Sequence, residues 1–199
     1  MTTRRGVRDE NLEVLERSSL SLSEIADLLD TLLRDPIRYA ASVQVTCAAA
    51  GDYAAGDAIS ASATDTLGRA IWVPDLARPP GGVATIMTIV AKCSEDAVLA
   101  SLRLFWFLEE PQPAAVEMDD NVAFDLKTAI GRNICLGNGI LLNAFNDRGT
   151  AAAMSTTSDI REPLRCGPGR MGLWMLPTFE VAEANETAGM TIDFEVYTL

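Results

Sequence analysis

The side chains most able to do chemistry in this sequence are acidic, and they gather at one place. Four residues with oxygen-bearing side chains lie close together: Glu117, Asp119, Asp120 and Asn121. Calcium prefers such ligands, but the regular ligand spacing of a calcium loop is absent. Paired carboxylates also hydrolyse glycosidic bonds, yet adjacent residues on a strand point in opposite directions and no single pair stands out. We therefore interpret the cluster as a turn, with ion binding and glycoside processing as the alternatives.

Other catalytic and metal chemistries have few residues to work with. The 199-residue chain contains no histidine, which excludes a serine triad that uses a histidine base. Its four cysteines are widely spaced, at Cys47, Cys93, Cys135 and Cys166. We expect free thiols, because a domain of this size is stable without disulfides, and we expect Cys47 in the core. The sequence thus predicts a protein that is not an enzyme, with no metal, no cofactor and no catalytic residues.

Three tryptophans offer a different kind of site. Trp72, Trp106 and Trp174 could together form a platform for stacking sugars, as in a carbohydrate-binding module. All three lie within apolar runs, which favours packing in a core or an interface. A carbohydrate-binding or adhesive module of a virion or cell surface remains the second functional hypothesis.

The charge balance limits the possible partners. With 28 acidic and 16 basic residues the net charge is −12, which argues against a nucleic-acid partner. No apolar run is long enough to cross a membrane, and the polar start lacks the apolar core of a secretory signal, so we expect synthesis in a cytoplasm. Basic charge is concentrated at Arg4, Arg5 and Arg8. This tip either docks on an acidic partner or is a solvated chain end.

Residues 1–41 are predicted to form an N-terminal arm with an amphipathic helix at about 22–34. Ser21 and Glu24 have the spacing of a capping box, and Asp35-Pro36 ends the helix. The apolar face of the helix consists of Ile25, Leu28, Leu29, Leu32 and Leu33. A short helix is marginal alone, so this face must pack either on the chain's own β domain or on a neighbouring subunit.

Residues 42–199 are predicted to form an all-β domain, a β-sandwich or jelly-roll-like fold, because short apolar runs alternate with Gly, Pro, Asn and Asp turns. The clearest period of two is at 190–197. Other strands are predicted at 43–48, 58–63, 70–76, 83–90, 99–108, 122–126, 132–136, 140–145 and 171–179. The segment 150–165, rich in Ala, Ser and Thr, is predicted to be a long loop.

Two of these strands, 83–90 and 99–108, are apolar on both faces. Such strands are either central or covered by a partner. In the second of them Arg103, Phe105 and Phe107 share one face by alternation, a combination typical of interfaces. A second packed layer of the chain itself would explain them equally well.

One order of motifs points to a family. It comprises Val43-Gln44-Val45, then Tyr53-Ala54-Ala55-Gly56-Asp57-Ala58-Ile59, then 84–90, then 102–107 before Pro111-Gln112-Pro113, then Asp120-Asn121 before Ala123-Phe124. Across residues 43–199 this order resembles the small head decoration (cement) proteins of tailed bacteriophages.

The resemblance implies a structural virion protein. Such a protein is a compact β-sandwich on the outer surface of the capsid, usually a homotrimer at three-fold positions, where it locks adjacent major capsid protein subunits together. The N-terminal arm is longer than this family leads us to expect, but it suits a clamp on neighbouring subunits.

Overall fold

The computed structural model describes residues 39–47, 53–60, 68–77, 79–94, 101–147, 153–182 and 190–199. The chain divides into two units, Met1–Ile37 and Arg38–Leu199, and all described residues belong to the second. The predicted helix at about 22–34 therefore lies outside the described residues. So do the basic tip and the apolar face predicted for it: Arg4, Arg5, Arg8, Ile25, Leu28, Leu29, Leu32 and Leu33.

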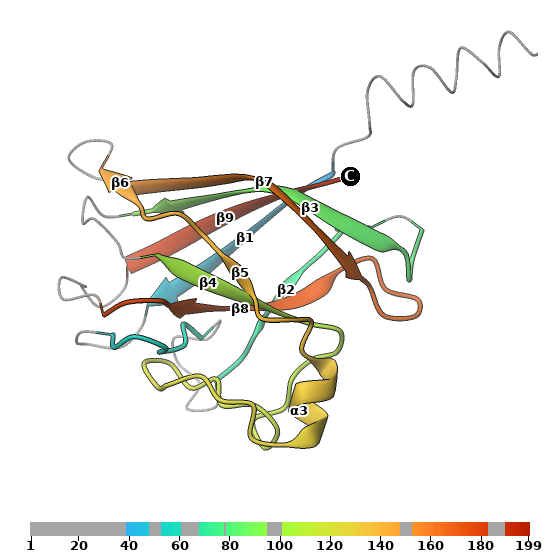
Figure 1. Cartoon of the computed structure of the whole chain (residues 1–199), viewed down its shortest axis with the longest axis horizontal. Helices are drawn as coiled ribbons and strands as arrows, with labels where there is room; N and C mark the ends of the chain where they lie inside the picture. Colours follow the sequence, from blue (N-terminus) through green and yellow to red (C-terminus); the bar gives the residue numbers. More distant parts are fainter. Residues whose placement is uncertain are drawn as a thin grey trace, which may run out of the picture. The chain divides into compact units, whose positions relative to one another are not determined.

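The described part of the chain is mostly β, in two antiparallel sheets (Figure 1). The five-stranded sheet has the order β1 (Tyr39–Cys47), β9 (Met190–Thr198), β3 (Val83–Cys93), β7 (Ala153–Arg165) and β6 (Asn146–Asp147). The four-stranded sheet has the order β2 (Ile71–Val73), β8 (Leu173–Phe179), β4 (Leu102–Phe107) and β5 (Ile140–Leu141). β1 begins at Tyr39, earlier than the predicted start of the β domain at residue 42.

The strand β9 follows the period of two that its sequence predicts. Met190, Ile192 and Phe194 are buried, and the residues between them are half-buried. β9 lies between β1 and β3, and its inward side chains contribute to a core shared by both sheets. The four-stranded sheet contributes Leu102, Leu104, Trp106, Leu173 and Met175 to the same core.

The segment 140–147 carries the chain from one sheet to the other. Its first residues form β5 in the four-stranded sheet, and its last form β6 in the five-stranded sheet (Figure 1). Between them Asn143 is fixed to β7: its N–H donates to Thr157 Oγ1 at 2.9 Å, and its Nδ2 donates to Thr156 O at 3.0 Å. A strand that switches sheets in this way joins the two sheets through one piece of backbone.

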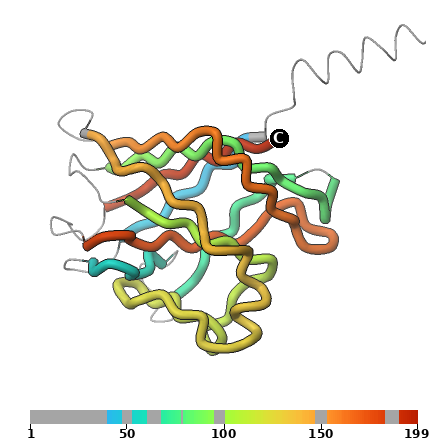
Figure 2. The backbone as a smooth tube through the Cα atoms, in the orientation of Figure 1, coloured from blue at the N-terminus to red at the C-terminus, as the bar shows by residue number. Residues whose placement is uncertain are grey.

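Part of the far face of the four-stranded sheet is covered by residues 109–136, which we call the covering segment (Figure 2). It includes the single helix of the described residues, α3 (Ala129–Ile134). Val116 and Met118 from this segment pack with Phe107 of β4 and Leu176 of β8 in a second hydrophobic cluster. No helix in the described residues is long and apolar enough to cross a bilayer.

The strand predicted at 132–136 is wrong, because α3 occupies most of it. The Thr128 hydroxyl caps the helix by accepting a hydrogen bond from the Gly131 N–H at 3.2 Å. At Cys135 the backbone turns extended, and the Leu136 N–H then donates to Trp106 O at 2.7 Å. The short apolar run thus faces the sheet as one helical turn rather than as a strand.

The loop predicted at 150–165 is also wrong. Residues 153–165 form β7, which pairs with β3 along its length apart from a register shift between Ile86 and Thr88. Pairing with a central strand satisfies the backbone of β7, and its outward side chains can remain polar. Elsewhere the predicted strands at 58–63 and 122–126 contain only isolated bridges among their described residues, at Ala58, Ala123 and Asp125.

Candidate partner-binding surface

The three β4 residues predicted for partner binding share the face of the sheet that points away from the common core. Their neighbours Leu102, Leu104 and Trp106 are fully buried in that core. The register agrees, since Arg103 lies opposite Thr178 of β8 and opposite Leu141 of β5. This face is therefore the one on which the covering segment packs.

The covering segment occupies the Phe107 end of this face. Phe107 is fully buried, and Phe105 is half-buried with its ring stacked on Phe124 at 4.2 Å. The chain's own residues thus cover the second apolar face of β4 here, which is the packed-layer alternative that the sequence had left open. Arg103 and the exposed part of Phe105 remain accessible.

Arg103 is held in a two-pronged ion pair with Glu180, which follows β8. Arg103 Nε donates to Glu180 Oε2 and Nη2 donates to Oε1, each at 2.8 Å. A third bond joins Arg103 Nη1 to Asn138 O at 3.1 Å. The mutual hydrogen bond raises the pKa of Arg103 and lowers the pKa of Glu180. The pair therefore presents a fixed, ionised surface at neutral pH.

Beside this ion pair lies a shallow concavity of about 300 Å³, which we call the Phe105 concavity. Its lining residues are Ala55, Gly56, Arg103, Phe105, Phe124, Thr178, Phe179 and Glu180. Two exposed apolar side chains are neighbours of its lining residues. Leu141, which is paired with Arg103 on β5, is 47% exposed, and Val181, which follows Glu180, is 52% exposed. Aromatic surface with a polar rim suits contact with a protein or stacking of a sugar.

The acidic cluster forms a turn, as predicted, and its carboxylates bind backbone and side-chain donors. Asp119 Oδ1 accepts from the Gly68 N–H at 2.7 Å. Asp120 accepts from the Tyr53 hydroxyl at 2.6 Å and from the Ser60 N–H at 3.0 Å. Among the described residues, no group of three or more His, Cys, Asp or Glu side chains could hold a metal ion.

Glu117, the first member of the cluster, is paired with Lys127. The hydrogen bond from Lys127 lowers the pKa of Glu117, so this carboxylate is ionised at neutral pH. Its backbone forms an isolated bridge with Asp125. The ion pair and the bridge thus connect the residue that precedes the acidic turn to residues that follow it.

The tryptophans and cysteines occupy mainly packed positions. Trp106 is fully buried in the core, one of the two kinds of packing predicted for the tryptophans, and Trp72 and Trp174 are half-buried with their rings 5.3 Å apart. Cys47 is fully buried, also as predicted. Cys135 and Cys166 are unpaired thiols, and burial raises the pKa of Cys166.

Sequence reasoning missed Glu180, Phe124 and Leu141 as members of this surface. Phe124 was predicted to lie on one face of a strand, but its contact with Phe105 arises because the covering segment packs against β4. Glu180 lies beyond the end of β8, where no motif marks it as the partner of Arg103. No protein-family model matches the chain, and no curated protein matches it.

Proposed function

We propose that this chain is a structural virion protein, a capsid decoration (cement) protein that binds the outside of a bacteriophage head. In this proposal its fold is a β-sandwich or jelly-roll-like domain with an N-terminal helical arm. It acts as a homotrimer that stabilises contacts between major capsid protein subunits, not as an enzyme. It uses no cofactor, binds no nucleic acid and does not enter a membrane.

The observation that carries the proposal concerns two motifs of the family resemblance. The stretches 53–59 and 120–124 are far apart in the sequence, yet they are bonded to each other. The Ala58 N–H donates to Val122 O and the Phe124 N–H donates to Gly56 O, each at 2.9 Å. With the bond between Tyr53 and Asp120, these contacts make the two motifs one structural unit. Motifs that build a framework fit a structural protein better than an enzyme.

Charge and surface support the same role. A net charge of −12 favours solubility before assembly. The Phe105 concavity and the exposed Leu141 and Val181 beside it supply apolar surface with a polar rim, which can be buried in a lattice. The predicted arm would add a second attachment point on a neighbouring subunit.

The test is occupancy on undecorated capsids of the phage that encodes the chain, with sedimentation of the free protein to measure its oligomeric state. We expect saturable binding and a trimer. Leu141→Asp should weaken binding by about tenfold, because burying one leucine contributes about 1.5–3 kcal/mol. Ile130→Asp is the matched control, since Ile130 is 67% exposed on α3. No saturable binding of the wild-type protein would refute the proposal.

A second candidate function is carbohydrate binding. It is favoured by one observation: the Phe105 concavity places an aromatic ring beside Thr178, Arg103 and Glu180 in a hollow of about 300 Å³. Sugars stack on such rings while polar groups bind their hydroxyls. A glycan array followed by calorimetry would test this function. Binding that is lost in Phe105→Ala, with folding intact, would favour the glycan role over the capsid role.

A further inference from the structure

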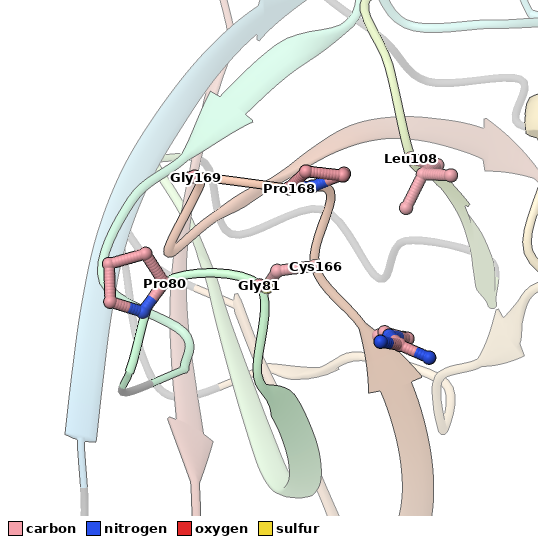
Figure 3. A pocket seen from close by; sticks show the side chains of 7 residues that line it. Pro80, Gly81, Leu108, Cys166, Pro168 and Gly169 are labelled. Atoms are coloured by element: carbon pink, nitrogen blue, oxygen red, sulfur yellow. The ribbon is translucent and has the colours of Figure 1, made fainter.

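Two Pro-Gly turns lie side by side and line a second pocket, which is open to solvent (Figure 3). In residues 79–82 and 167–170 the first carbonyl accepts a hydrogen bond from the fourth N–H, at 2.9 and 3.0 Å. The third residue of each turn is a glycine with positive φ: Gly81 at 77° and Gly169 at 71°. These are type II turns, which need glycine at that position.

Two backbone hydrogen bonds join the first turn to the segment that contains the second. The Gly81 N–H donates to Arg170 O at 2.7 Å, and the Cys166 N–H donates to Gly82 O at 2.9 Å. The pocket has a volume of about 450 Å³, and its walls include Leu108 and a proline from each turn. Since prolines and cross-bonds restrict the backbone, a ligand would meet a pocket that is already formed.

The pocket is cationic in a chain whose net charge is −12. Arg165 lines it, and Arg170 is the last residue of the second turn. Within the described residues neither guanidinium has an ion pair or hydrogen bond, whereas Lys92, Arg103 and Lys127 are each paired with a glutamate. These two arginines have no carboxylate partner among the described residues, and they lie beside an apolar hollow. Such a surface is complementary to a ligand in which a carboxylate stands next to an apolar group.

We propose that this Pro-Gly pocket binds a partner-protein segment in which an apolar side chain stands next to a carboxylate. The apolar side chain enters between Leu108 and the two prolines, and the carboxylate pairs with Arg165. The exposed Glu109, which follows Leu108, disfavours a segment with further acidic residues on that side. This inference does not depend on the capsid proposal, because it concerns a different surface and any partner with this chemistry.

The experiment uses the full chain, labelled with nitrogen-15, and two blocked tetrapeptides: Leu-Pro-Leu-Glu and its neutral twin Leu-Pro-Leu-Gln. Amide shifts of Gly81, Cys166 and Gly169 are followed during titration. We expect saturable shifts with the Glu peptide and about twofold to fivefold weaker binding of the Gln peptide, as for a partly exposed ion pair. Raising the salt concentration should reduce this preference.

The variant Arg165→Gln should bind both peptides equally while the backbone spectrum stays otherwise unchanged. Arg132→Gln is the matched control, since Arg132 is also exposed but lies on α3 and does not line this pocket. It should keep the full preference for the Glu peptide. The proposal is overturned if no amide of the pocket shifts in a saturable way, if the two peptides bind equally to the wild-type chain, or if Arg165→Gln retains the preference.

Discussion

Removing the hydroxyl of Tyr53 should destabilise the chain while leaving its fold intact. Tyr53 is fully buried, and its hydroxyl donates to Asp120 Oδ2 at 2.6 Å. Tyr53→Phe keeps the ring, whose centroid lies 4.9 Å from that of Phe179. Hydrogen bonds to charged groups contribute about 1.5–3 kcal/mol. Because Asp120 is half-buried and water can partly replace the hydroxyl, we expect a loss near the lower end, about 1.5 kcal/mol.

The assay is urea unfolding followed by tryptophan fluorescence. A loss of about 1.5 kcal/mol should lower the unfolding midpoint at unchanged slope and reduce Tm by about 3–6 °C for a chain of this size. The matched control is Tyr197→Phe, whose hydroxyl donates to Glu195 at 3.0 Å on an accessible face, and it should change little. The reasoning is refuted if Tyr53→Phe stays within about 0.3 kcal/mol of the wild type, or if the control costs as much.

Further predictions concern charge, capping, metal and the arm. The hydrogen bond from Arg103 lowers the pKa of Glu180. The contribution of this ion pair to the free energy of unfolding is therefore complete above the ordinary carboxyl pKa of 4.5 and is lost as pH falls through the lowered pKa. Glu180→Gln should therefore cost up to about 1 kcal/mol at pH 7 and flatten the acid side of a stability profile; an unchanged profile would contradict this. Thr128→Ala should cost about 1 kcal/mol in urea unfolding through loss of the α3 cap, and no change would mean that the cap is not stabilising. Thermal melts should be indifferent to EDTA, and a fall of several degrees that calcium reverses would show a metal site. Replacing Leu28 and Leu32 with Asp should weaken capsid occupancy far more than tenfold without altering the melt; normal binding would exclude the arm as an anchor.

Much of the β character could be predicted because its signals are local. The alternation along β9 predicts which side chains are buried, since successive residues of a strand point to opposite faces. The turn at 79–82 could be read from its prolines and glycines, which restrict the backbone directly. The acidic turn was likewise predicted from residue types, although its bond to Tyr53 was not.

The candidate surface could be predicted only in part. Alternation correctly placed Arg103, Phe105 and Phe107 on one face of β4, but it could not tell whether a partner or the chain itself covers that face. The packing of Phe124 on Phe105 decides this for one end of the strand. The ion pair between Arg103 and Glu180 could not be predicted, because the two residues come close only through the pairing of β4 with β8.

By itself, the sequence determined the strand-rich class, the alternating faces and the Pro-Gly turns, because each follows from the conformational preferences of a few consecutive residues. Only the tertiary structure decided that 153–165 is a strand and that the run before Cys135 is a helix. The first is a strand because its backbone pairs with β3 on both sides of the register shift, and its small polar side chains give no sign of this pairing. The second is a helix because Thr128 caps it and the sheet buries one side of a short turn. In both segments the local preferences are weak, so contacts with distant strands set the outcome.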